Sequence, residues 1–241
     1  MIGLGTIINT IAVIAGGMIG IFLKKGMKQK TQDTLMQACG ISVIFIGISG
    51  ALSKILVWNN GKFETTGTML LIFSLVIGTL LGEWLDIEDK MEKTGEKIKA
   101  AVKAQNDSRF VEGFVNVSLI ICVGAMAIVG SIQDGISGDY SMLAAKAVLD
   151  FIIVMIFAAT YGVGAIFSAV LIFIYQGTIT LIAALCGSFV SELIINDLSY
   201  VGSVLIFCVG INVGFGKKVN VGNMLPALVV VVLYDIIVQI I

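Results

Sequence analysis

The sequence contains no histidine and a single proline, and only 13% of its 241 residues are charged. The lack of histidine excludes imidazole metal sites and histidine proton relays. Sixteen acidic and fifteen basic residues give a net charge of −1, which argues against a nucleic-acid partner. The four cysteines stand singly in apolar runs, without the spacing of a metal site, as is typical of small buried side chains. We therefore expect no cofactor.

Hydrophobic residues make up 58% of the chain, and the mean hydropathy is +1.04. A soluble domain of this length cannot bury so much apolar surface, so the expected surroundings are a lipid bilayer. A helix of about 20 apolar residues spans the hydrocarbon core. The sequence therefore predicts an all-α polytopic membrane protein with a single transmembrane domain over 1–241. The eight candidate segments are 2–23, 35–56, 66–85, 112–132, 141–162, 165–190, 197–216 and 222–241.

Basic residues are concentrated in three linkers. Residues 24–34, 86–111 and 217–218 hold 12 of the 15 lysine and arginine residues. If all eight segments cross the membrane, these linkers lie on one side. The positive-inside rule then favours eight crossings with both termini outside. The residues left for the opposite side are Lys54, Lys62 and Lys146.

Linker 86–111 is the main hydrophilic stretch. Apolar residues recur in it at helical spacing among lysine and glutamate, namely Ile87, Met91, Ile98 and Val102. This pattern predicts an amphipathic cytoplasmic helix on the inner membrane surface. A solvated helical connector is the alternative.

A repeated motif divides the chain. Three stretches begin with Gly-Thr and carry two small residues further on: Gly5-Thr6 with Gly16 and Gly20, Gly67-Thr68 with Gly78 and Gly82, and Gly177-Thr178 with Gly187 and Ser191. The repetition predicts units of about 2–56, 66–162 and 165–241. With eight crossings the last unit is inverted, as in many secondary transporters. The same small residues also suit helix packing, within the chain or across a homodimer.

The inversion depends on segment 165–190. Tyr161-Gly162-Val163-Gly164 predicts a break before this segment, and Gln176-Gly177 predicts a second break inside it. The segment therefore either crosses the membrane or turns back as a re-entrant hairpin. A hairpin would remove the inversion.

Ionisable side chains inside apolar segments are the candidate functional groups. Lys146 and Asp150 are four residues apart and therefore share one helix face. A carboxylate at the bilayer centre costs about 2.5–3.5 kcal/mol to insert, and a lysine partner offsets part of this. The two residues form either a neutralised structural pair or an ion site, in which Asp150 binds Na⁺ or H⁺ and Lys146 tunes its charge.

Ser168, Gln176 and Asn212 supply oxygen atoms of the kind that suit hard cations. We predict that they are further ligands of an ion or substrate. The alternative role for each is an interhelical hydrogen bond. The identity of a bound metal does not follow from these residue types.

Four further acidic residues are expected near the outer surface. Asp134 and Asp139 lie in a glycine-rich stretch that we expect to be an outer loop, where they attract cations or form turns. Asp197 flanks a short outer turn and is expected to be solvated. Asp235 is close to the end of the chain and is expected to reach the membrane interface.

Several runs carry a family resemblance: Gly3-Leu4-Gly5-Thr6-Ile7-Ile8-Asn9, Cys122-Val123-Gly124, Gly130-Ser131-Ile132-Gln133-Asp134-Gly135, Tyr175-Gln176-Gly177 and Asn223-Met224-Leu225-Pro226. Over essentially the whole chain, they resemble bacterial inner-membrane proteins of the YqgA/YdfK type, a domain of unknown function numbered 554. The resemblance implies a multi-pass protein of the bacterial plasma (inner) membrane, labelled as a sodium channel or pump. It supplies no catalytic or binding residues. Ala125 and Val170 replace prolines common in the family, which predicts straighter helices there.

These observations favour a membrane transporter or channel for a small ion or solute, linked to Na⁺ or H⁺ and acting as a homo-oligomer. The alternative is a structural or regulatory membrane protein that transports nothing and acts as a homo-oligomer. An intramembrane enzyme is a third reading, because Tyr234-Asp235 resembles half of an aspartyl-protease site. The usual Gly-x-Gly-Asp partner is absent and no histidine can serve as a base, so we do not expect an enzyme.

Overall fold

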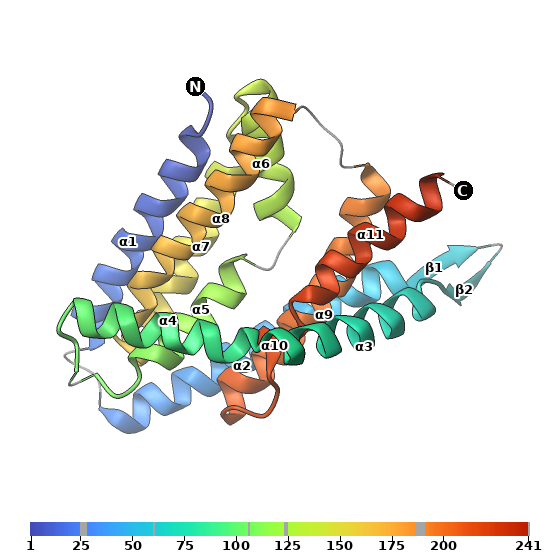
Figure 1. Ribbon diagram of the computed structural model, residues 1–241. Helices are drawn as coiled ribbons and strands as arrows, with labels where there is room; N and C mark the ends of the chain where they lie inside the picture. Colours follow the sequence, from blue (N-terminus) through green and yellow to red (C-terminus); the bar gives the residue numbers. More distant parts are fainter. Residues whose placement is uncertain (25–27, 60, 106, 123–124, 187–190, 241) are drawn as a thin grey trace. The chain divides into compact units, whose positions relative to one another are not determined.

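The computed structural model describes residues 1–24, 28–59, 61–105, 107–122, 125–186 and 191–240 (Figure 1). Helices dominate these residues, and the predicted all-α polytopic membrane fold is confirmed. The helices are α1 (Leu4–Lys24), α2 (Gln29–Ile55), α3 (Thr68–Leu85), α4 (Ile87–Ala101), α5 (Phe110–Cys122), α6 (Ala125–Ser137), α7 (Ser141–Tyr161), α8 (Gly164–Cys186), α9 (Glu192–Phe215), α10 (Val221–Met224) and α11 (Pro226–Ile240).

Six helices of the described ranges are long and apolar enough to cross a membrane: α1, α2, α3, α7, α8 and α9. Helices α5 and α6 make a seventh candidate if the pair, bent by 62°, counts as one span. This bend contradicts the straighter helix predicted from Ala125. The last predicted segment is apolar but shorter, because Pro226 separates α10 from α11. Each of the eight predicted segments thus corresponds to a helix or a helix pair.

A β-hairpin joins α2 to α3, where the sequence analysis predicted no strands. Strands β1 (Leu56–Asn59) and β2 (Lys62–Thr65) pair antiparallel, with Leu56 opposite Thr65. All eight strand residues are exposed. The rings of Trp58 and Phe63 meet edge to face at 4.8 Å, a cross-strand contact that stabilises so short a hairpin.

The described chain clusters into two compact units. Unit 1 consists of Met1–Cys39, Met91–Cys122 and Met126–Phe189, and it contains α1, α5, α6, α7 and α8. Unit 2 consists of Gly40–Lys90, Val123–Ala125 and Val190–Ile241, and it contains the hairpin, α3, α9, α10 and α11. Linker 86–111 contains the predicted helix, which is α4 (Ile87–Ala101), and the location of this helix at a membrane surface stays a prediction.

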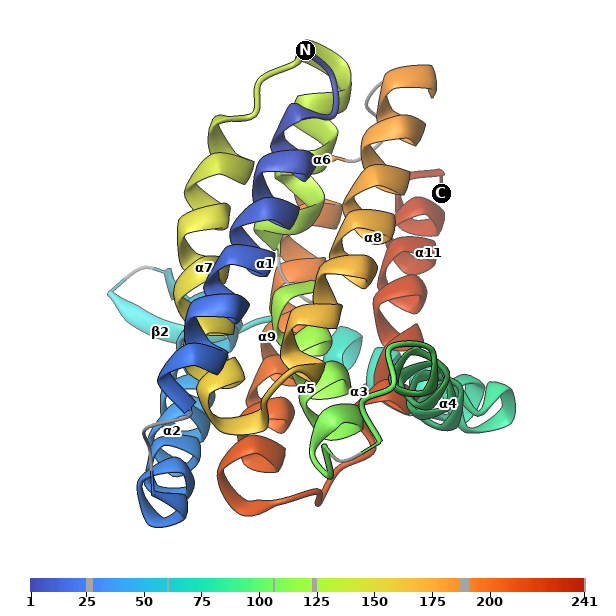
Figure 2. The same ribbon diagram turned by 90° about the vertical axis from the view of Figure 1, so that its left-hand side faces the viewer.

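In unit 1, helices α1 and α7 pack side by side (Figure 2), and the contact follows the glycines of α1. A Cβ atom on Gly16 would collide with the carbonyl group of Phe151, and one on Gly20 would collide with that of Met155. Residue numbers rise together along this interface, so the two helices are parallel. The packing role predicted for the first pair of small residues is therefore confirmed.

Helix α8 runs antiparallel to α1 and contains no break. Gly17 lies against Ile166, near the start of α8, whereas Asn9 contacts Gln176 further along it. The helix continues through Gln176-Gly177, so the predicted break there is wrong. A Cβ atom on Gly177 would meet nothing within 4 Å. A continuous α8 is long enough to cross the membrane.

The third pair of small residues does not repeat the packing of the first. Gly187 lies outside the described residues. Ser191 is not on α8, because it caps the N-terminus of α9, where its hydroxyl accepts a hydrogen bond from the Ile194 N–H at 3.4 Å. The opposite directions of α1 and α8 are those that an inverted repeat requires, and the inversion itself stays a prediction.

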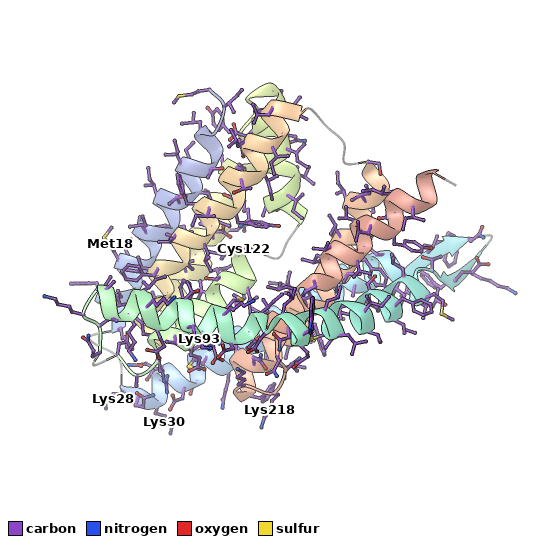
Figure 3. All side chains as sticks on the ribbon, in the orientation of Figure 1. Met18, Lys28, Lys30, Lys93, Cys122 and Lys218 are labelled. Carbon is purple, nitrogen blue, oxygen red and sulfur yellow. The ribbon has the colours of Figure 1, made fainter. Side chains whose placement is uncertain are left out.

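Unit 2 uses glycine contacts of the same kind. Gly78 of α3 lies against Ala227 of α11, and Gly82 lies against Asn223 of α10, so α3 is antiparallel to this helix pair. Gly47 of α2 likewise lies against Phe207 of α9. In unit 1, by contrast, α1 exposes large apolar side chains. Met18 (Figure 3) and Phe22 are examples, and such side chains suit contact with lipid.

The glycine contacts lead to a paired prediction. Gly16→Leu should lower the free energy of unfolding by about 1–3 kcal/mol or prevent folding, because the side chain has no space beside Phe151. Gly177→Leu should be neutral or slightly stabilising, because its position is open and leucine favours a helix. Thermal unfolding of both variants in the same detergent tests this. Equal destabilisation would contradict the packing described here.

Candidate functional site

Four polar side chains from three helices meet inside unit 1. Lys146 and Asp150 come from α7, Asn9 from α1 and Gln176 from α8. Lys146 is 6% exposed and Asp150 is 3% exposed, and both amides are fully buried. The Lys146 ammonium contacts Asp150 Oδ2, and Asn9 Nδ2 donates to the same oxygen at 2.9 Å and to Gln176 Oε1 at 3.2 Å. The structure thus brings together three predicted site residues and adds Asn9.

Helical periodicity and glycine packing explain this meeting. Lys146 and Asp150 point the same way because they are four residues apart in α7. Asn9 lies on the face of α1 that also carries Gly16 and Gly20, seven and eleven residues further on. The face that approaches α7 therefore also directs Asn9 towards the carboxylate. The position of Asn9 on the glycine face of α1 is therefore the sequence feature from which its place in the cluster could have been predicted.

Four buried polar atoms on the helices that supply Asn9 and Gln176 lack partners among the described residues. They are Thr6 Oγ1 and Asn9 Oδ1 on α1, with Gln176 Nε2 and Thr180 Oγ1 on α8. All four atoms are buried in the described part of the chain, where most polar atoms find a hydrogen bond. Three are oxygen atoms, and they lie on the helices that supply Asn9 and Gln176. The cluster therefore offers a carboxylate and spare oxygen donors to a small polar ligand.

Transition-metal chemistry has no support within the described residues. No group of three histidine, cysteine, aspartate or glutamate side chains gathers there. Hydroxyl, amide and carboxylate oxygens instead suit a hard cation or a proton.

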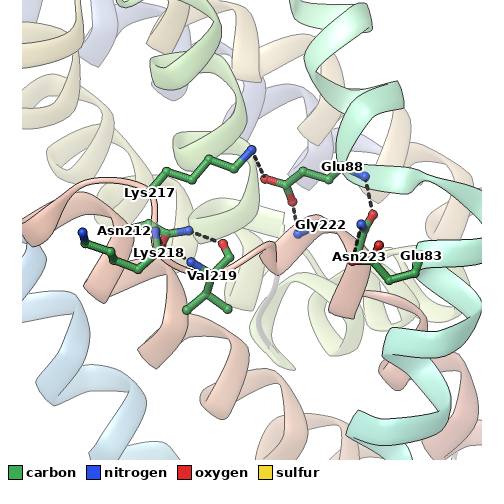
Figure 4. Close-up of polar contacts among 8 residues, drawn as sticks. All are labelled: Glu83, Glu88, Asn212, Lys217, Lys218, Val219, Gly222 and Asn223. Atoms are coloured by element: carbon green, nitrogen blue, oxygen red, sulfur yellow. Dashed lines mark hydrogen bonds and ion pairs between the residues drawn. The ribbon is translucent and has the colours of Figure 1, made fainter.

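The remaining predicted ligands bond elsewhere. Ser168 is buried in α8, but its hydroxyl donates to the Ala165 carbonyl of the same helix at 2.7 Å. Asn212 belongs to unit 2, where its Oδ1 accepts the N–H groups of Lys218 and Val219 at 2.8 and 3.0 Å. Its Nδ2 donates to the Val219 carbonyl at 2.7 Å, so its amide holds the turn after α9 (Figure 4).

Asp134 lies in a helix and not in the predicted outer loop. It belongs to α6 and is fully buried. Its two carboxylate oxygens accept the N–H groups of Gly3 and Gly5 at 3.2 and 3.0 Å. These N–H groups form the start of α1, where a negative charge also stabilises the helix dipole. Asp134 therefore fixes the end of α1 that precedes Asn9.

Asp139 does lie in a turn, between α6 and α7. Its Oδ1 accepts the Ser141 hydroxyl at 2.6 Å and the Ser141 N–H at 3.0 Å. These bonds to the charged form hold the pKa of Asp139 below its usual value. Of its two predicted roles, the contacts match the turn former.

A second polar network lies in unit 2 (Figure 4). Glu88 is buried at the start of α4; its Oε2 accepts the Gly222 N–H at 2.5 Å and its Oε1 meets Lys217 Nζ at 3.2 Å. Asn223 accepts the Glu88 N–H at 2.7 Å and donates to Glu83 at 2.9 Å. The network joins the α3–α4 junction to α10 and is structural.

The basic linker residues Lys28 and Lys30 of unit 1, in contrast, are exposed (Figure 3).

Loss of the Asp134 carboxylate should destabilise unit 1. Asp134→Ala removes two charge-assisted hydrogen bonds from the start of α1, and we expect it to cost about 1–3 kcal/mol of unfolding free energy. Glu96→Ala, at an exposed position of α4, serves as the control and should be nearly neutral. Thermal unfolding in detergent measures both. An Asp134→Ala protein as stable as the control would refute the capping role.

The buried ion pair predicts non-additive stability. Lys146→Met leaves the Asp150 carboxylate without its cation, and we expect a loss of about 3–5 kcal/mol. Lys146→Met combined with Asp150→Asn should be more stable than Lys146→Met alone, because the uncompensated charge is gone. A double-mutant cycle by thermal unfolding gives the coupling. Strictly additive losses would mean that the pair does not interact.

The sequence comparisons agree with a membrane protein. The model of the family described as "Protein of unknown function (DUF554)" matches residues 4–236. The chain is 34% identical over 226 residues to the "Uncharacterized membrane protein YdfK" of Bacillus subtilis, covering 94% of this chain and 93% of that protein. It is 28% identical over 235 residues to the "Uncharacterized protein YqgA" of Escherichia coli, covering 93% of each.

No solved structure matches the chain. The family match over nearly the full length, the first relative and the helical membrane fold all point the same way. The chain is therefore a member of the DUF554 family of membrane proteins.

Proposed function

We propose that this protein is a transporter or channel for a small ion or solute, linked to Na⁺ or H⁺, with Asp150 as its ion-binding group. The observation that carries the proposal is a carboxylate only 3% exposed near the middle of α7. Ionisable groups inside the membrane are expensive to bury and are usually functional. The unpartnered oxygens on α1 and α8 strengthen the case, because a purely structural pair does not need them.

The contacts support a mechanism in which the coupling ion competes with Lys146 for the Asp150 carboxylate. Asp150 Oδ2 receives both the Lys146 ammonium and the Asn9 amide. A cation or proton that binds this carboxylate weakens its attraction to Lys146, because the carboxylate charge is then shared or neutralised. Binding of the coupling ion is thereby linked to movement of the Lys146 side chain. Such a link between binding and rearrangement is what ion-coupled transport requires.

The donors around Asp150 favour Na⁺ or H⁺ over softer ions. Thr6 and Thr180 provide hydroxyl oxygens without protein partners, and Asn9 provides a free amide oxygen. Together with the carboxylate they form the hard oxygen set that suits Na⁺. A proton needs the carboxylate alone. The flux experiment below distinguishes the two by the gradient that drives uptake.

The proposed setting is the inner membrane of a bacterium, with several crossings and both termini outside. The parallel course of α1 and α7 and the antiparallel course of α8 in unit 1 agree with eight crossings. The antiparallel course of α3 and the α10–α11 pair in unit 2 agrees as well. The basic linkers then lie on the cytoplasmic side.

Flux in proteoliposomes tests the proposal. The wild-type protein should take up a labelled ion or solute under a Na⁺ or H⁺ gradient, and Asp150→Asn should reduce the rate at least tenfold, because the amide carries no charge to bind the coupling ion. Ser131→Ala is the matched control: Ser131 is buried in unit 1, but its hydroxyl only donates to Ala127 of its own helix. It should leave the rate unchanged.

Two results would count against transport. One is full activity of Asp150→Asn; the other is no flux by the folded wild-type protein across a broad panel of ions and solutes. The second result would favour the alternative, a structural or regulatory membrane protein that acts as a homo-oligomer. Exchange of labelled subunits between detergent-solubilised samples would then test self-association directly.

A further inference from the structure

Two aspartates face each other in unit 2. Asp235 of α11 is fully buried at 0% exposure, which corrects the expectation that it reaches the interface. Asp197 of α9 is half-buried, although it was expected to be solvated. The two carboxyl groups lie within hydrogen-bonding contact of each other. Helices α9 and α11 pack together, so the contact is part of the core of unit 2.

Two ionised carboxylates cannot form this contact as a hydrogen bond. Both groups would then be acceptors only, and like charges in contact repel. Neither oxygen of Asp235 receives an N–H or O–H group from the described residues. A fully buried carboxylate with no donor is very unfavourable. A single proton between the two groups supplies the missing donor and removes one charge.

The surroundings place the remaining negative charge on Asp197. Lys54 of α2 acts electrostatically on Asp197, and its ammonium donates to the neighbouring Asn196 Oδ1 at 2.5 Å. The other group near Asp197 is the Tyr200 hydroxyl, which is buried and has no partner among the described residues. Helix α3 also packs on α11, but its only ionisable residue, Glu83, contacts Asn223 in α10, before the start of α11.

We propose that unit 2 contains a proton-binding site in which Asp197 and Asp235 share one proton, with Asp235 as the donor and Asp197 as the acceptor. The ligand is H⁺, and the two side chains bind it without any other group. The buried Tyr200 hydroxyl lies within electrostatic range of the pair and can orient towards it. This site does not depend on the transport proposed for Asp150.

Infrared spectroscopy of the reconstituted protein tests the shared proton. At mildly acidic pH, the spectrum of the wild type minus that of Asp235→Asn should contain the C=O stretch of a protonated carboxyl group. The wild type minus Asp197→Asn should contain the same band, because the proton needs both partners. The difference spectrum for the exposed Asp139→Asn should lack this band. Absence of the band from either of the first two spectra would overturn the proposal.

Stability measured against pH provides a second test that does not rely on spectra. At mildly acidic pH, the folded pair retains a proton that the unfolded chain has largely released, so wild-type stability should fall as the pH rises through this range and the pair loses the proton. Asp235→Asn should remove this fall and should fold, because an amide can donate to Asp197. An identical pH dependence in wild type and Asp235→Asn would overturn the shared proton. Neither experiment uses flux, so failure of the transport proposal would leave both results interpretable.

Discussion

The close approach of α1 to α7 is the constraint on which the site in unit 1 depends. Gly16 and Gly20 allow the α1 backbone to touch the carbonyl groups of Phe151 and Met155. With larger residues there, the helices would separate by several ångströms, and Asn9 would lose its 2.9 Å hydrogen bond to Asp150. Because lipid gives apolar helices little reason to associate, such backbone contact is also a main source of their association. The two glycines thus determine both the packing of α1 on α7 and the geometry of the site.

The second requirement is charge balance in a medium of low dielectric constant. A lone Asp150 carboxylate would cost several kcal/mol to bury, and Lys146 reduces this cost only while both side chains stay together. Asn9 and Gln176 add hydrogen bonds, yet each retains one unpartnered polar atom. A cluster built only for stability would be expected to pair these atoms or replace them with apolar groups. The incomplete pairing therefore favours the proposed binding site over a purely structural ion pair.

The sequence predicted the helices well and their contacts unevenly. Hydropathy located the spans because crossing the hydrocarbon requires a fixed length of apolar chain. Spacing of four residues was enough to pair Lys146 with Asp150, since both lie in one helix. The break at Gln176-Gly177 was wrong because one glycine weakens a helix without ending it when neighbouring turns remain hydrogen-bonded. Contacts between distant segments, such as Asp134 with Gly3, depend on tertiary packing that no local pattern encodes.

The two units neutralise their buried carboxylates in different ways, and the difference has a mechanistic consequence. In unit 1 the compensating charge belongs to the protein, because Lys146 is covalently part of α7. In unit 2 the partner of Asp235 is another carboxyl group, so the compensating charge must come from solution as a proton. The Lys146–Asp150 pair is therefore neutral without a ligand and must give up a contact to bind one. With the shared proton proposed above, unit 2 is most stable when this proton is bound. Release of that proton, and not its uptake, is then the step that requires unit 2 to rearrange or to hydrate the pair.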